Sequence, residues 1–261
     1  MNGGNAMTLE RFFGQDIDPE KAVQLFNIHH LYYAIFLVIT YIVTLKFAAK
    51  IKASAKEHTY KTYAFIFLAF LETTYHIHNW SGGIFSIPLH VCSFAVFMNL
   101  ALLLTDSKKV FNYAFFFGIC GGTIALLLPL SKGYTYYNYR YYNFLIIHCT
   151  IVAIPLYYYK ALGYRVTYRT TLKVYRTSVL SMIVVLFIDR FLVDLGVPIA
   201  EANYWFVAFI PANVEGVFTS WSVYVATFML AVFLSMSLLY LLTCHSYQMK
   251  QKKLLKDAIN D

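Results

Sequence analysis

The chain has 261 residues, of which 59% are hydrophobic and only 13% are charged. Soluble globular proteins carry about 25% charged residues, so this composition excludes an ordinary soluble enzyme. The formal net charge is +8, and the position of the basic residues along the chain determines which partner that charge meets.

Apolar stretches of about 20 residues, each long enough to cross a ~30 Å hydrocarbon core, recur along most of the chain. The second is the least apolar, because its second half contains Glu72 and His76. We therefore predict an all-α polytopic membrane protein with seven transmembrane helices. The predicted spans are 27–49, 60–79, 87–104, 110–130, 142–159, 177–195 and 221–244.

The predicted spans form one membrane domain, residues 27–244, between an N-terminal segment 1–26 and a basic tail 245–261. The segment 1–26 lacks the basic start and short apolar core of a signal peptide, so we expect it to be retained.

Lysine and arginine are distributed unequally between the two sides of the predicted membrane. Sixteen of the 21 lie in or beside the connections after spans one, three and five and in the tail, and four lie on the other side. The positive-inside rule predicts a cytoplasmic C-terminus and an N-terminus outside. A basic cytoplasmic face meets anionic lipid headgroups, so we expect no nucleic-acid partner and an integral protein of the cell membrane.

The four cysteines all fall inside apolar stretches and show no CxxC spacing. This pattern predicts neither a disulfide nor a zinc site, and nothing in the sequence implies a cofactor. Free cysteine usually packs as a small hydrophobic residue, and we predict this role for Cys120, Cys149 and Cys244.

Ionisable residues inside membrane spans cost about 2.5–3.5 kcal/mol each on insertion scales, so their positions are informative. Helical spacing lets Glu72 and His76 share a face, whereas His90 and Cys92 point in different directions. A base for Cys92 is therefore expected from another helix, and His148 is the nearest in depth. The topology places these groups in the outer half of the membrane: Glu72, His76, Cys92, His148, Asp189 and Arg190.

A helix start at residues 86–90 would place Cys92 within the second turn, where the positive helix end favours a thiolate. Such residues also have simpler explanations. An intramembrane histidine is often only a hydrogen-bond link between helices. A transporter or channel would instead use Glu72, His76, Asp189 and Arg190 to line a proton or solute path. The residues alone do not name a reaction.

The segment Pro88-Leu89-His90-Val91-Cys92 resembles the PLHLC segment of the YwaF-like membrane family, which includes animal transmembrane protein 164. As in that family, a glutamate stands 16 residues before the proline, and a histidine stands 56 residues after the cysteine. Asn203-Tyr204-Trp205-Phe206 followed by Pro211 is similar to its segment before the last span. The resemblance covers roughly residues 60–244.

This resemblance implies a seven-helix fold related to the androgen-induced membrane hydrolases. It also implies an acyltransferase in which an intramembrane cysteine and histidine move an acyl chain from a phospholipid to a lysolipid. By position, Cys92 is the nucleophile and His148 its base, and Glu72 or Asp189 could orient His148. The supporting residues are Glu72, His76, His90, Asp189, Arg190, Asn203 and Tyr204.

The sequence departs from the family pattern at Val91, which replaces a leucine, and Gly216 and Trp221 only partly match its glycine and tryptophan. The donor and acceptor lipids stay open, as does hydrolysis in place of transfer. The sequence does not determine the oligomeric state.

Overall fold

A computed structural model describes residues 8–15, 17–18, 22–129, 133–211 and 214–251, and these residues form helices and loops with no strand. The last ten residues of the predicted basic tail lie outside the described part. The chain divides into two compact units, Met1–Pro88 with Cys92–Leu162 (unit 1) and Leu89–Val91 with Gly163–Asp261 (unit 2). Each unit is described by itself.

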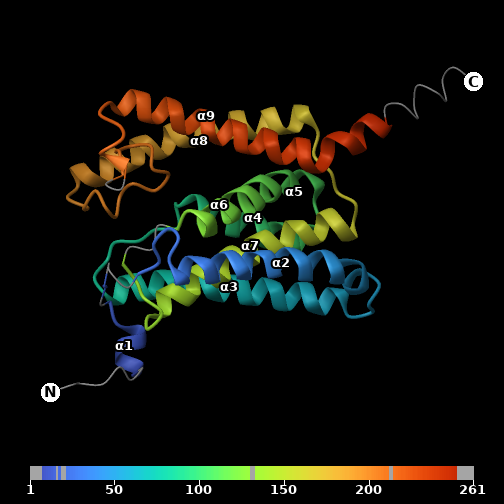
Figure 1. The fold of residues 1–261 in the computed structure, drawn as a ribbon, viewed down its shortest axis with the longest axis horizontal. Coiled ribbons are helices and arrows are strands. Elements are labelled where there is room, and N and C mark those ends of the chain that lie inside the picture. Colours follow the sequence, from blue (N-terminus) through green and yellow to red (C-terminus); the bar gives the residue numbers. More distant parts are fainter. Residues whose placement is uncertain (1–7, 16, 19–21, 130–132, 212–213, 252–261) are drawn as a thin grey trace, which may run out of the picture. The chain divides into compact units, whose positions relative to one another are not determined.

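Unit 1 is a helical bundle in which α7 packs against α2, α3, α6 and η1 (Figure 1). The α5, η1 and α6 segments follow one another without a break, so a π-helical turn interrupts one longer helix. The helices are α1 (Leu9–Phe13), α2 (Ile28–Lys52), α3 (Glu57–Ser81), α4 (Val91–Thr105), α5 (Lys108–Ala114), η1 (Phe115–Gly121), α6 (Gly122–Leu127) and α7 (Tyr139–Ala161).

Unit 2 contains two long helices, α8 (Tyr168–Asp194) and α9 (Trp221–Tyr240), and α9 continues into η3 (Leu241–His245). The two helices pack together, and the Tyr175 hydroxyl donates a hydrogen bond to the Met229 carbonyl (3.3 Å). The connection between them is described for residues 195–211 and 214–220, and several side chains discussed below hold it.

Every predicted span coincides with a helix, which confirms a helical membrane protein. Within the described residues, four helical stretches are long and apolar enough to cross a membrane: Ile28–Lys52, Lys108–Leu127, Tyr139–Ala161 and Trp221–Gln251. The apolar α4 is shorter, and α3 and α8 are long but more polar. On α2, Ile42 is 59% and Phe36 50% exposed, as expected for a lipid-facing surface. Seven crossings and their orientation stay predictions.

Two glycines bring the helix η1–α6 close to α7. A Cβ at Gly118 would lie 2.3 Å from the Ile151 carbonyl oxygen, and one at Gly122 would lie 2.7 Å from Val152 Cγ2. Small residues four apart are a common device for close helix contact in membranes. The side chain of Asn99 also points at the Ile151 carbonyl (3.5 Å). This contact fixes the part of α7 that carries His148.

Polar networks lie at the two ends of unit 1. At the end called here the Glu57 end, Glu57 accepts hydrogen bonds from Lys52 (2.9 Å) and from the Tyr157 hydroxyl (2.8 Å), and Lys61 bonds Asp106 (2.7 Å).

At the opposite end, the Gln15 end, the Gln15 side chain donates to the His78 carbonyl (2.5 Å) and accepts from the Tyr134 hydroxyl (2.7 Å). The network at the Gln15 end connects the segment after α1, the end of α3 and the segment before α7.

Candidate functional site

Cys92 lies in the first turn of α4, because the helix begins at Val91. The predicted helix start, and with it the second-turn position, is therefore wrong: residues 88 and 89 form a turn before the helix. The first N–H groups of a helix have no intrahelical partner. Cys92 and Ser93 are among these first residues of α4, so their backbone N–H groups have no intrahelical acceptor.

His148 lies in the middle of α7 and is only 3% exposed. Its Nδ1 is 2.6 Å from the Phe144 carbonyl oxygen, and the Phe144 and His148 ring centroids lie 4.2 Å apart with the rings tilted by 39°. A carbonyl only accepts, so Nδ1 carries the hydrogen and Nε2 is the basic nitrogen. The group that orients His148 is therefore a backbone carbonyl on its own helix.

Cys92 and His148 share two charged neighbours. The Glu72 carboxylate and the Arg140 guanidinium each interact electrostatically with the Cys92 thiol and with the His148 ring. The structure thus brings Glu72, Cys92 and His148, which come from three helices, into one polar neighbourhood of unit 1.

Glu72 and His76 form the pair that their spacing predicts, with His76 Nε2 3.2 Å from Glu72 Oε1. The pair continues into a chain of hydrogen bonds. His76 Nδ1 is 2.8 Å from the Ser86 hydroxyl, which accepts from Asn79 at 2.9 Å. Because Asn79 donates to Ser86, the Ser86 hydroxyl can donate to Nδ1, and Nε2–H then donates to Glu72. Sequence analysis missed Asn79 and Ser86, which carry no motif.

The remaining predicted site residues belong to unit 2. Asp189 is fully buried, and its Oδ2 accepts a hydrogen bond from the Tyr204 backbone N–H at 2.9 Å, while Oδ1 has no partner within the part of the chain that the structure describes. His90 Nδ1 donates to the Tyr204 carbonyl at 2.9 Å, and the two rings pack at 4.8 Å. Asp189 and His90 therefore hold the two sides of one backbone residue.

Asn203 and Arg190 hold the next part of the same loop. The Asn203 side chain donates to the Phe209 carbonyl (2.9 Å) and accepts from its N–H (3.4 Å). Arg190 donates to the Ala208 carbonyl (2.6 Å) and lies over the Phe209 ring at 4.3 Å. These hydrogen bonds hold the part of the connection between α8 and α9 that runs from Asn203 to Phe209.

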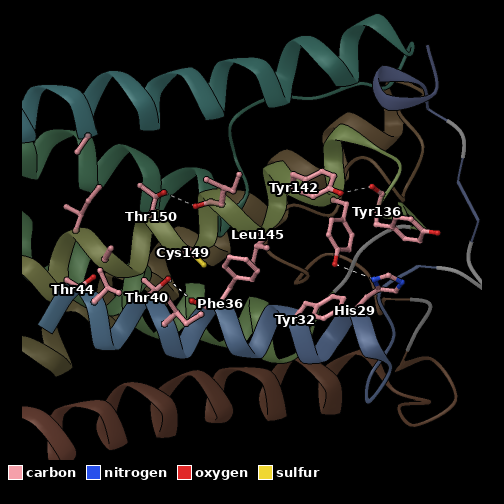
Figure 2. Close-up of a pocket in the computed structure, with 17 residues that line it drawn as sticks. His29, Tyr32, Phe36, Thr40, Thr44, Tyr136, Tyr142, Leu145, Cys149 and Thr150 are labelled. Carbon is pink, nitrogen blue, oxygen red and sulfur yellow. Dashed lines mark hydrogen bonds between the residues drawn. The ribbon is translucent and has the colours of Figure 1, made fainter. Parts of the chain in front are cut away.

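Unit 1 also has a groove of about 870 Å³ between α2 and α7, with Ala64 of α3 in its lining. That volume is within the ~300–1,000 Å³ typical of ligand sites. Figure 2 shows His29, Tyr136 and Tyr142 gathered at one end, and Thr40, Cys149 and Thr150 farther along it.

The groove and the Cys92 neighbourhood use different faces of α7. Leu145 and Cys149 line the groove, and Cys149 follows His148, so their side chains point about 100° apart. Cys149, predicted to be a packing residue, is half-buried at the groove wall. Among the described residues no group of three or more His, Cys, Asp or Glu could hold a metal ion.

These features define a helical integral membrane protein with a buried histidine, a buried glutamate and a half-buried cysteine in one helical bundle. The model of the TMEM164 family, a transmembrane protein family, matches residues 25–240. The chain therefore belongs to the TMEM164 family, which confirms that part of the predicted resemblance; the wider YwaF-like relationship stays a prediction. No curated protein and no solved structure matches the chain.

Proposed function

We propose that the protein is a membrane-embedded lipid acyltransferase, or acyl-exchange enzyme, with Cys92 as nucleophile and His148 as base. The observation that carries the proposal is the pair of charged neighbours, Glu72 and Arg140, that Cys92 and His148 share within unit 1. The uncommitted Nε2 of His148 supports the same assignment.

In the first half-reaction, the Cys92 sulfur attacks the ester carbonyl of a donor phospholipid. His148 Nε2 takes the thiol proton and returns it to the departing lysolipid oxygen, which leaves a thioester on Cys92. In the second half-reaction, the hydroxyl of an acceptor lysolipid attacks the thioester, and the proton returns to sulfur by the reverse route. Water in place of the acceptor would make the same site a hydrolase.

The developing oxyanion needs hydrogen-bond donors placed in advance. The backbone N–H groups at the start of α4, among them those of Cys92 and Ser93, can serve as such donors. Glu72, bonded to His76, stabilises the cation that His148 becomes after it takes the proton.

The membrane topology belongs to the same proposal. Seven crossings with the N-terminus outside place Cys92 and His148 toward the outer leaflet of the cell membrane, where phospholipids and lysolipids are the substrates. The unit 2 residues His90, Asp189, Arg190, Asn203 and Tyr204 then shape the loop before the last span, and their role is supporting.

The test is reconstitution of the purified protein with labelled phospholipid and unlabelled lysolipid. We expect the wild type to move label between lipids and to carry an acyl group on Cys92 that neutral hydroxylamine removes. Cys92→Ala and Cys92→Ser should show little or no turnover, and His148→Ala should slow acylation by about 100-fold or more. Glu72→Gln should cost less than either.

Cys149→Ala is the matched control, because Cys149 lies on the groove face of α7 and should keep full turnover. If Cys92→Ala transfers label as well as the wild type and no acyl adduct is found by mass spectrometry, the enzyme assignment is wrong. A transporter using Glu72, His76, Asp189 and Arg190 would then be the better account.

A further inference from the structure

Arg140 is a half-buried cation to which the proposed reaction assigns no step of its own. It is the second residue of α7, and its guanidinium lies 3.8 Å from the centre of the Tyr75 ring and 5.5 Å from that of Tyr134. The Tyr134 hydroxyl also accepts a hydrogen bond from it. Two of its three nitrogens, Nε and Nη1, are buried and have no hydrogen-bond partner among the described residues.

Among the described residues no carboxylate forms a salt bridge with Arg140. Glu72 bonds His76, Glu57 pairs with Lys52 and Lys61, and Asp106 pairs with Lys61. Buried donors of a cation that lack partners are costly, and in membrane proteins such groups are candidates for a functional site. An anion with oxygen acceptors would satisfy these donors.

The position of Arg140 relates that anion to the proposed site. Arg140 precedes His148 by eight residues, which is about 12 Å along the helix. Its charge nevertheless acts on the Cys92 thiol and on the His148 ring. A ligand anion at Arg140 would therefore lie toward the Gln15 end of unit 1 from His148, and its charge would reach Cys92 and His148 as that of Arg140 does.

We infer that Arg140 binds the phosphate of the lipid substrate, an inference that rests on the proposed function. The phosphate of a glycerophospholipid is only a few bonds from its ester carbonyls, so a phosphate held at Arg140 directs those carbonyls toward Cys92. Arginine is suited to this task, because its planar guanidinium donates charge-assisted hydrogen bonds to phosphate oxygens. Arg140 would thus select phospholipids over neutral glycerides.

The test measures binding rather than turnover, in the Cys92→Ala protein, so that it does not depend on the nucleophile. The probes are a lysophosphatidylcholine and a monoacylglycerol with the same acyl chain. We expect tighter binding of the lysophospholipid, and Arg140→Gln should weaken it by about 10- to 100-fold while leaving monoacylglycerol binding unchanged. Arg140→Lys should keep part of the preference.

Arg11→Gln is the matched control, because Arg11 lies over the Tyr137 ring at 3.9 Å at the same end of the unit and should not affect the preference. If Arg140→Gln weakens the binding of both lipids equally, Arg140 only holds helices together. If the substitution weakens neither, the inference is also overturned. Retention of labelled inorganic phosphate by the wild type, without preference between the lipids, would assign the site to the free ion instead.

Failure of the acyltransferase proposal is distinguishable from failure here. If the protein shows no lipid turnover but still prefers the lysophospholipid through Arg140, the phosphate site is supported and the acyltransferase proposal is wrong. If turnover is normal but Arg140→Gln keeps the preference, the acyltransferase proposal is supported and the phosphate site is wrong.

Discussion

Glu57 is the residue whose ionisation we expect to control the stability of unit 1 in acid. Burial alone raises the pKa of its carboxyl, but hydrogen bonds from Lys52, Tyr157 and Lys61 lower it more, and the net pKa is about 2 instead of 4.5. A carboxyl whose pKa is lowered by folding stabilises the folded state at pH values above the pKa it has in the unfolded chain. This contribution is lost as the pH falls toward the pKa in the folded state. The relevant window is therefore about pH 4.5 to 2.

Glu57→Gln should unfold at a lower temperature than the wild type at pH 7, and the difference should shrink as the pH falls through that window. Thermal unfolding in detergent at several pH values measures this. Glu10→Gln, an exposed position on α1, is the control and should behave as the wild type at every pH. A constant difference between Glu57→Gln and the wild type down to pH 2 would contradict the assignment.

Single residues also show where sequence reasoning succeeds. Glu72 and His76 could be paired in advance because they lie on one helix, four residues apart. Ser86, Asn79 and the Phe144 carbonyl could not, because nothing in the sequence says which loop or backbone oxygen a buried histidine meets. Arg140 is one of the four basic residues that the sequence places on the outer side, and its contact with Tyr75 could not be predicted because it depends on how two helices pack.

At the scale of helices, the close approach of η1 to α7 gives a sharp prediction. A methyl group at Gly118 would lie 2.3 Å from the Ile151 carbonyl oxygen, a backbone atom that cannot rotate away. Overpacking of this kind costs about 1–3 kcal/mol, so Gly118→Ala should lower the unfolding temperature. It should also reduce lipid turnover, because α7 carries His148 a turn away.

Gly121 is the matched control for that substitution. It belongs to the same π-helical segment, but a Cβ there would meet nothing within 4 Å, and alanine favours helix over glycine by roughly 1 kcal/mol. Gly121→Ala should therefore unfold at the same temperature as the wild type or slightly higher. Equal unfolding temperatures for Gly118→Ala and Gly121→Ala would show that η1 and α7 are not in close contact.

The positions of the helices were largely predictable, whereas their contacts were not. Apolar stretches locate the helices because a span must satisfy its backbone internally and present apolar side chains to lipid. The same signal does not fix a helix end, and α4 begins at Val91 because residues before it form a turn. The π-helical turn and the two glycine contacts depend on the partner helix, which hydropathy does not identify.

For the whole molecule, the orientation in the membrane is the prediction with the widest consequences. Because the chain divides into two compact units, the side of the membrane on which each connection lies must be tested directly. The uneven distribution of lysine and arginine predicts that the connections near Lys56 and Arg169 face the cytoplasm and the one near Lys132 faces outward. The side on which Arg140 meets its phosphate follows from the same assignment.

Single cysteines placed at these three positions, in a background without accessible thiols, test the orientation with a thiol reagent that cannot cross membranes. In intact cells the cysteine at position 132 should react, and those at positions 56 and 169 should react only after the membrane is opened. Each variant should keep lipid turnover, which shows that it is folded. Reaction at position 56 together with protection at position 132 would show that the orientation is the reverse of the predicted one. Cys92 and Arg140 would then act on lipids of the cytoplasmic leaflet.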